Sequence, residues 1–322
     1  MTVIETHGLR KEFVRARGGR TIALAGLDLS VPEGGVFGFL GPNGSGKTTT
    51  IRCLLGLIGP TSGACRLLGA DSTSESDLAR VIRRVGSIVE TPALFPGFSG
   101  RRNLQLLARL HGISRKTVED LLGRVGLASR ANDRIRTYSL GMRQRLGIAA
   151  ALLKDPEVLI LDEPANGLDP AGMKEVRDLL RNLADEGRTV FLSSHLLGEV
   201  QQICDRVAIL SRGRCIATGP VGEVLAQGRA AGMLVRVDDA PGAMAVLSAA
   251  GIESTLQDGV VRVSLPAAEG GRITKALADR EIYLKELRQD EVSLERVFLE
   301  LTGDGVEGHM TTPGRPDAEL PS

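Results

Sequence analysis

A glycine-rich loop near the N-terminus has the residue types and spacing of a phosphate-binding site. Gly41, Gly46, Lys47 and Thr48 match the pattern G-x-x-x-x-G-K-[ST], between a strand-like and a helix-like apolar run. Glycines let backbone N–H groups turn inward around phosphate oxygens, and the following helix points its positive end at them. Lys47 is expected to reach the β- and γ-phosphates, and the Thr48 hydroxyl to ligate Mg²⁺. The predicted nucleotide-binding residues are Gly41, Pro42, Asn43, Gly44, Ser45, Gly46, Lys47, Thr48 and Thr49.

Two adjacent carboxylates, Asp162 and Glu163, follow the apolar run of "VLILDEP". Parallel strands that are buried on both faces have such continuous apolar runs, and α/β folds bind ligands at the carboxyl ends of these strands. Asp162 is expected to hold Mg²⁺, mostly through water, and Glu163 to orient or deprotonate an attacking water. Together with the glycine loop, the pair predicts hydrolysis of a nucleotide.

The elements that must position these residues alternate between strand and helix patterns. Strand-like runs include "GGVFGFL" before the loop, "EVLILDEP" and "TVFLSSH". Helix-like runs include "TTTIRCLLGLI", closed by Gly59-Pro60, and "AGMKEVRDLLRNLADEG". This alternation predicts an α/β fold. From about residue 100 to 153 the pattern is mostly helical, which predicts a helical subdomain over about 91–153.

The composition of the chain changes after about residue 225. Strand and helix patterns then alternate over a shorter region, including a hairpin with Asp258-Gly259 at its turn. We therefore expect a first domain at 1–225, a small α+β accessory domain at 226–302, and a disordered tail at 303–322, where the sequence is polar and rich in glycine and proline.

The bulk composition fits a globular protein of two domains. The chain has 322 residues, 42% of them hydrophobic, and its longest apolar stretches are far shorter than the roughly 20 residues that span a bilayer. The N-terminus has no apolar signal-peptide core, so we expect a cytosolic location. A net charge of +1 argues against nucleic acid as a partner. The four cysteines form no CxxC pair, which predicts reduced, structural thiols.

Further motifs carry a family resemblance. "YSLGMRQR", placed before the Asp-Glu strand, resembles a variant of the ABC signature motif; "NGLDP" matches the D-loop, and "SSH" matches the switch histidine, His195. The phosphate loop is the one typical of P-loop NTPases. Together with that loop, these motifs come in the family's order over residues 9 to about 220. The chain thus resembles the ATP-binding subunit of an ABC transporter.

This resemblance implies a mechanism in which two subunits pair head to tail, with two ATP molecules between them. Ser139 and Gly141 would then donate to the γ-phosphate held by the opposite subunit, and Asp169 would couple the two sites. His195 would contact the γ-phosphate, and Phe13 would stack on adenine. The pair is expected to be either two copies of this chain or one copy with a paralogue.

The chain departs from the common family pattern at two places. Its signature has Leu140 and Met142 where the common form has glycine and glutamine. Glu90 occupies the position of a glutamine that contacts Mg²⁺ and the attacking water, so it is predicted as a further metal ligand and catalytic residue. A third carboxylate would change metal affinity and raise pKa values in the site. The alternative is that Glu90 lies beside the site without touching the metal.

Two segments are similar to particular subgroups of the family. "GSIVETPALFP" resembles subunits associated with bacitracin and lantibiotic export, and "SLERVFLELTG" resembles the end of daunorubicin-type export subunits. These similarities favour an ATPase that drives efflux of a drug, antibiotic or lipid-like compound through a separate membrane permease. The ATPase subunit is then expected on the cytoplasmic side of the membrane, bound through the permease. The alternatives are an importer subunit, a soluble ABC ATPase that acts without a permease, and a regulatory module that holds ATP without hydrolysing it.

The predicted contact with the permease lies after Glu90, in "ALFPGFSG". Phe95 and Phe98 flank Pro96-Gly97 there, in a loop that the family uses as its transmission interface. An arginine-rich stretch follows at 101–145 and is either a solvated helical face or a surface that faces anionic lipid or an acidic partner.

Overall fold

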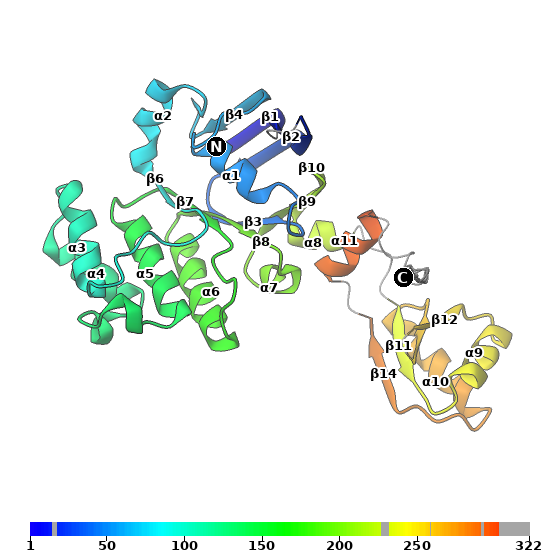
Figure 1. The fold of residues 1–322 in the computed structure, drawn as a ribbon. Helices are drawn as coiled ribbons and strands as arrows, with labels where there is room; N and C mark the ends of the chain where they lie inside the picture. Colours follow the sequence, from blue (N-terminus) through cyan, green and yellow to red (C-terminus); the bar gives the residue numbers. More distant parts are fainter. Residues whose placement is uncertain (15–17, 227–231, 258, 291–292, 303–322) are drawn as a thin grey trace, which may run out of the picture. The chain divides into compact units, whose positions relative to one another are not determined.

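The computed structural model describes residues 1–14, 18–226, 232–257, 259–290 and 293–302. The chain divides into two compact units, Met1–Val224 and Leu225–Ser322, each of which is described by itself (Figure 1). The predicted tail at 303–322 and the turn residue Asp258 lie outside the described residues. Within the described part, no helix is both long and apolar enough to cross a lipid bilayer.

A six-stranded sheet forms the centre of the first unit. Its strand order is β10-β9-β3-β8-β7-β6, and every neighbouring pair is parallel except β9 with β10. The strands are β3 (Gly35–Leu40), β6 (Val85–Ile88), β7 (Val158–Asp162), β8 (Thr189–Ser194), β9 (Arg206–Ser211) and β10 (Arg214–Pro220). β7 and β8 are buried throughout their lengths, as continuous apolar runs predict. Because the strands are parallel, the carboxyl ends of β3, β7 and β8 lie at the same edge of the sheet.

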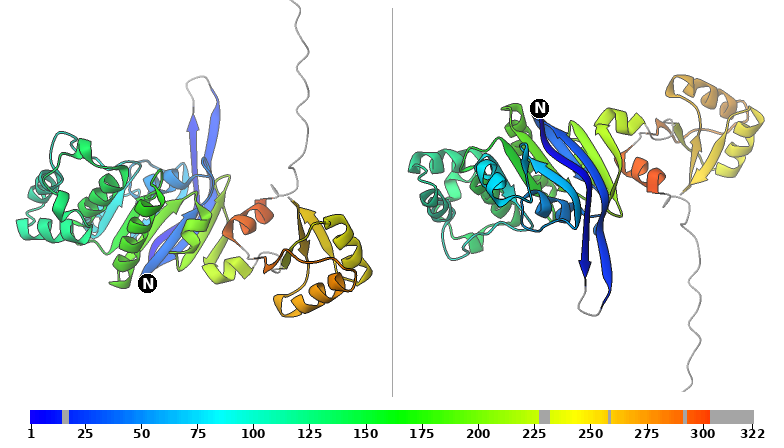
Figure 2. Two further views of the ribbon diagram at one scale, coloured as in Figure 1. Left: turned by 90° about the horizontal axis from the view of Figure 1, so that it is seen from below. Right: turned by 90° about the horizontal axis from the view of Figure 1, so that it is seen from above.

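The N-terminal strands form a separate antiparallel sheet, whose order is β2-β1-β4-β5. Its strands are β1 (Thr2–Val14), β2 (Arg20–Pro32), β4 (Ser62–Leu67) and β5 (Ala70–Asp71). β1 and β2 pair along almost their whole length as a long hairpin (Figure 2). Their alternating pattern predicts strands but not this second sheet, because the choice of neighbour depends on contacts far apart in the chain. One apolar core joins both sheets and includes the fully buried rings of Phe39 and Phe191, whose centroids are 5.2 Å apart.

Helix α1 (Lys47–Leu54) follows the glycine loop and packs against both β4 and β7. It is shorter than the predicted run, which extended to Gly59-Pro60. Gly56 adopts φ 67° after its end, and the N–H of Leu57 donates to the carbonyl of Arg52. A glycine in the left-handed region commonly closes a helix in this way, so the glycine ends the helix before the proline can.

Some of the remaining helices of the first unit pack on the central sheet, and others pack mainly on neighbouring helices (Figure 1). α3 (Gly100–Leu110), α4 (Arg115–Arg124) and α5 (Leu140–Leu152) fill the predicted helical region, each with a serine N-cap. α6 (Pro170–Asp185) packs on β3 and β8. The others are α2 (Glu75–Val81) and α7 (Leu197–Gln201), while α8 (Val221–Ala226) contains the boundary between the two units in the sequence. Short 3₁₀ turns lie at Ile82–Arg84, Ala128–Arg130 and Ile135–Thr137.

The second unit is an antiparallel sheet with two helices packed on it, as the α+β prediction requires. The strand order is β12-β13-β11-β14. Its elements are β11 (Met233–Arg236), α9 (Ala240–Ala249), β12 (Ser254–Gln257), β13 (Val260–Val263), a 3₁₀ turn (Ala267–Glu269), α10 (Gly270–Ala278), β14 (Glu286–Gln289) and α11 (Leu294–Thr302). Val235, Val261, Leu247 and Ile273 are fully buried in a core of this unit alone.

Candidate active site

The glycine loop joins the end of β3 to the start of α1, as the motif predicts. A Cβ atom at Gly41 would lie 2.4 Å from the carbonyl oxygen of Leu210, and one at Gly46 would lie 2.7 Å from that of Ala23. Gly46 also has φ 111°, a conformation that L side chains rarely adopt. It is the N-cap of α1 and has no side chain to accept from the first N–H groups. These donors therefore remain available to an anion at the helix N-terminus.

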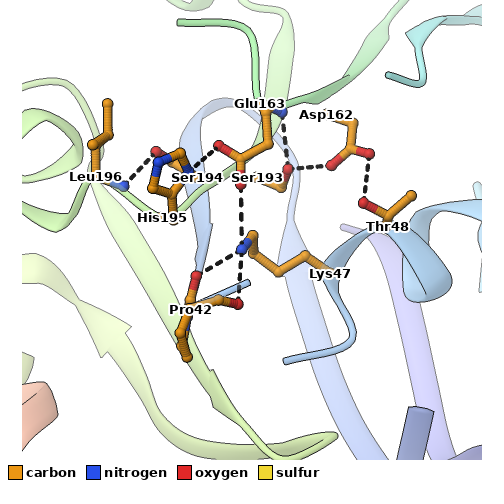
Figure 3. Close-up of polar contacts among 10 residues, drawn as sticks. Pro42, Lys47, Thr48, Asp162, Glu163, Ser193, Ser194, His195 and Leu196 are labelled. Carbon is orange, nitrogen blue, oxygen red and sulfur yellow. Dashed lines mark hydrogen bonds and ion pairs between the residues drawn. The ribbon is translucent and has the colours of Figure 1, made fainter. Parts of the chain in front are cut away.

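Lys47 is folded into the loop that precedes it. Its Nζ donates to the carbonyl oxygens of Gly41 at 2.6 Å and Pro42 at 3.2 Å, and lies 3.2 Å from Glu163 Oε1 (Figure 3). The side chain is only 6% exposed. The ammonium group is thus buried among oxygens, which compensates for its removal from water.

Asp162 is placed between two hydroxyl groups and is 2% exposed. Thr48 Oγ1 donates to its Oδ2 at 2.8 Å, and Ser193 Oγ donates to its Oδ1 at 2.5 Å (Figure 3). No group of three His, Cys, Asp or Glu side chains suited to a metal exists among the described residues. A hydroxyl and one carboxylate nevertheless fit Mg²⁺, which keeps several waters and is commonly held by one or two protein oxygens together with substrate phosphates.

Glu163 connects Lys47 with His195. Its Oε2 lies 2.8 Å from His195 Nδ1, while Oε1 faces Lys47. The residue has φ 50°, an uncommon conformation for a side chain of this size. Its N–H points at the oxygens of Ser193, at 3.0 Å from Oγ and 3.2 Å from the carbonyl. The ends of β7 and β8 thereby bring together the residues that the sequence predicts: Lys47, Thr48, Asp162, Glu163 and His195.

Glu90 lies at the margin of this cluster. It follows β6 with φ 65°, its side chain is 61% exposed, and its carboxylate pairs with Arg52. Arg52 stands four residues after Thr48 on α1, so the partner of Glu90 belongs to the same helix as the predicted metal ligand. Contact of Glu90 with a metal stays a prediction.

Phe13, Ser139, Gly141 and Asp169 are not joined to the glycine loop by any hydrogen bond that the structure describes. Phe13 is a partly exposed residue of β1, with Lys11 Nζ 5.2 Å from its ring centroid. Ser139 caps α5 and Asp169 caps α6, through bonds from Met142 N and Gly172 N. The roles of these four residues at the nucleotide stay predictions.

Ser193 is the residue of this cluster that the sequence reasoning missed. It contacts both carboxylate residues of the site, whereas the sequence pattern identifies it only as part of "SSH". A small hydroxyl residue two positions before the switch histidine is the signal that could have identified it.

Comparison with known proteins agrees with this geometry. Residues 24–166 match the family model described as ABC transporter. The chain is 38% identical over 311 residues to the bacitracin transport ATP-binding protein BcrA of Bacillus licheniformis, covering 95% of this chain and 99% of that protein. It is 39% identical over 324 residues to the daunorubicin/doxorubicin resistance ATP-binding protein DrrA of Streptomyces peucetius, covering 96% and 94%.

Among solved structures, the chain is similar to cbiO1 from Clostridium perfringens, part of the ABC transporter complex cbiONQ. The TM-score is 0.62 at 30% identity, over 70% of this chain and 91% of that one. The relatives, which match over nearly their full length, and the shared fold together show the family of this chain. Membership of this family implies ABC-type ATPase activity. This chain belongs to the ATP-binding subunits of ABC transporters, close to the BcrA and DrrA type of resistance ATPases.

Proposed function

We propose that this chain binds ATP with Mg²⁺ and hydrolyses it to drive export of a drug, antibiotic or lipid-like compound through a separate membrane permease. The observation that carries this proposal is the continuous set of contacts from the glycine loop through Lys47 and Glu163 to His195. It unites a phosphate-binding cation with a carboxylate suited to act as a base. The exported class rests on similarity to the resistance ATPases.

The Lys47–Glu163 ion pair supports a specific sequence of events. A phosphate group in the loop competes with Glu163 for the Lys47 ammonium, because it offers more charge at the helix N-terminus. Glu163 then keeps His195 as its partner and has one oxygen free to accept a proton from water. Magnesium, held by Thr48 and Asp162, would neutralise phosphate charge.

A second ATPase subunit completes the proposed site. The N-terminus of α5 has no acidic residue in its first turn, and Leu140 beside Ser139 is exposed. This helix end can therefore donate backbone N–H groups to a phosphate that another subunit presents. We propose a head-to-tail pair formed by two copies of this chain or by one copy with a paralogue.

The proposed permease contact is the loop that carries Phe95 and Phe98. Their side chains are 56% and 45% exposed, and their ring centroids are 5.7 Å apart. The loop is held in shape by Asn103, whose amide accepts from Phe95 N and donates to Phe95 O. Two exposed aromatic rings on a loop whose backbone is hydrogen-bonded are suited to act as interface anchors.

Basic side chains border this aromatic pair. Ile135 N donates to Phe98 O and Arg136 N to Pro96 O, which aligns the segment containing Arg134 and Arg136 with the loop. Both arginines are exposed. We propose that this surface faces the permease on the cytoplasmic side of the membrane.

The test is co-purification from native membranes, with tagged Glu163→Gln chain and Mg·ATP. Losing the carboxylate should stall hydrolysis and hold the subunits together, so that a multi-span membrane protein without its own ATPase domain is recovered. Cells that carry both proteins should then tolerate bacitracin- or daunorubicin-type compounds better than cells with the Glu163→Gln chain. Recovery of ribosomes, or of cytosolic proteins alone, would refute the export role.

A further inference from the structure

Ser193 links the two carboxylate residues of the site through one hydroxyl group. Its Oγ donates to Asp162 Oδ1 at 2.5 Å and accepts from Glu163 N at 3.0 Å (Figure 3). A serine hydroxyl has one hydrogen to donate and lone pairs to accept, so both bonds form at once. The residue is fully buried, which excludes water as a ready substitute.

The register of the central sheet gives Ser193 this position. Asp162 and Ser193 are direct partners in the parallel pairing of β7 with β8. β7 ends at Asp162, and the chain turns at Glu163 with φ 50°. The N–H of Glu163 points at both oxygens of Ser193, so the serine holds the first residue of the turn.

The same hydroxyl also fixes the rotation of the Asp162 carboxylate. With Oδ1 bound to Ser193, Oδ2 faces Thr48, the other predicted metal ligand. The turn at Glu163 aims its carboxylate between Lys47 and His195. Loss of the hydroxyl would leave Asp162 Oδ1 without its donor in a buried place and weaken the hold on the turn.

We propose that Ser193 is a positioning residue that sets the metal-holding carboxylate and the catalytic carboxylate in a fixed relation to each other. It acts through Asp162 and Glu163. This inference rests on the proposed roles of those two residues. Partners that orient metal-binding carboxylates typically change metal affinity or activity by about 10- to 100-fold when mutated.

The experiment compares Ser193→Ala and Ser193→Thr with a matched control, Thr6→Val. Thr6 is also buried on a strand, and its hydroxyl donates to the carbonyl oxygen of Leu27 at 2.8 Å, away from the site. Binding of the non-hydrolysable analogue AMP-PNP is measured by calorimetry with and without Mg²⁺. ATPase kcat and KM and the melting temperature are measured on the same samples.

Without Mg²⁺, the affinity of Ser193→Ala for AMP-PNP should be within about twofold of the wild-type affinity. The factor by which Mg²⁺ raises this affinity should be about tenfold smaller in Ser193→Ala than in the wild type. The kcat of Ser193→Ala should fall about tenfold or more, while KM changes less. Ser193→Thr retains the hydroxyl and should recover most of both. Thr6→Val should lower the melting temperature without altering the Mg²⁺ dependence.

Equal Mg²⁺ dependence in Ser193→Ala and Thr6→Val would overturn the proposal and leave the serine a structural residue. If Ser193→Ala does not fold, Ser193→Cys, which keeps a group of similar shape but a weak donor, takes its place in the same comparison. Failure of the proposed function gives a different result from failure of the Ser193 proposal. In that case the wild type itself would gain no affinity for AMP-PNP from Mg²⁺ and would not hydrolyse ATP.

Discussion

At the scale of single residues, the site is defined by how its charges are paired. The Lys47 cation is held by loop carbonyl oxygens and by Glu163, whose other oxygen meets His195. Asp162 is held by hydroxyl groups alone among its described partners. The carboxylate of Glu163, the proposed base, and that of Asp162, the proposed metal ligand, thus have different partners although the two residues are adjacent in sequence. This difference allows the two carboxylates to play different roles.

Glu90→Gln tests the third carboxylate near the site. Its ion pair with Arg52 is largely exposed, so removing the charge should change stability by less than about 1 kcal/mol. If Glu90 contributes to holding Mg²⁺, the concentration of Mg²⁺ for half-maximal ATPase activity should rise about two- to fivefold. An Arg52→Ala variant, which frees Glu90 but keeps its charge, is the control. An unchanged Mg²⁺ dependence in Glu90→Gln would favour the alternative that Glu90 only lies beside the site.

The cysteines predict a dependence of stability on alkaline pH. Burial raises the pKa of Cys53 to about 11 from its ordinary value of 9.0, and burial also raises the pKa of Cys204. In the unfolded chain these thiols ionise near pH 9, whereas in the folded protein they stay protonated. The stability they contribute is therefore fully present below pH 9 and is lost as the pH rises towards 11.

Denaturation in urea at pH 8, 9.5 and 10.5 measures this effect. The free energy of unfolding should fall over this series, and the fall should be smaller in a Cys53→Ala variant. Thiol alkylation of the folded wild type should be slow at pH 8, because the thiolate is the reactive form. Rapid alkylation of Cys53 at pH 8 would contradict the assignment.

At the scale of elements, function depends on what each strand or helix presents at its end. β3, β7 and β8 present the site at one edge of the central sheet. The loop before α3 presents Phe95 and Phe98 on the surface of the same unit. The rings of this loop are exposed, while Asn103 holds the backbone of Phe95 through two hydrogen bonds.

Phe95→Ala combined with Phe98→Ala should separate transport from ATP hydrolysis. Removing both rings eliminates the proposed anchor for the permease but leaves the glycine loop and the carboxylates untouched. Transport by the complex should fall at least about tenfold while the ATPase activity of the purified chain stays within about twofold. Leu110→Ala, which removes another exposed apolar side chain of the same unit, is the control. Loss of transport and ATPase activity together would contradict the proposed interface.

The sequence predicts the motifs of the site better than it predicts the contacts between strands that are far apart in the chain. The glycine loop and the Asp162–Glu163 pair follow from local spacing, because each motif lies at the junction of a strand with a loop or helix. Ser193 could not be assigned in this way, since its role depends on pairing with Asp162 across 31 residues. The separate sheet of β1 and β2 likewise depends on pairing with β4, far along the chain.

At the scale of the whole molecule, the chain contains two units with separate cores. The second unit buries its own apolar residues, among them Leu247 of α9 and Val261 of β13. A core of this kind allows the unit to unfold independently of the ATP site.

Leu247→Ala tests this independence. Removing a fully buried leucine should destabilise the second unit by about 2–4 kcal/mol. Calorimetric melting should show two transitions, and the mutation should lower the melting temperature of only one of them. Adding AMP-PNP and Mg²⁺ should raise the melting temperature of the other transition alone. Val224→Ala at the end of the first unit is a comparison that should act on the nucleotide-sensitive transition. A single transition that shifts as a whole in every sample would contradict the division.

The role of Glu163 as the catalytic base is tested most directly by measuring ATP binding and hydrolysis in the same Glu163→Gln sample. Glutamine keeps the shape of the side chain but cannot take a proton from water at neutral pH. ATP should bind with an affinity within about threefold of the wild type, while single-turnover hydrolysis should fall about 100-fold or more. Hydrolysis by Glu163→Gln at the wild-type rate would contradict this role, because the base would then lie elsewhere.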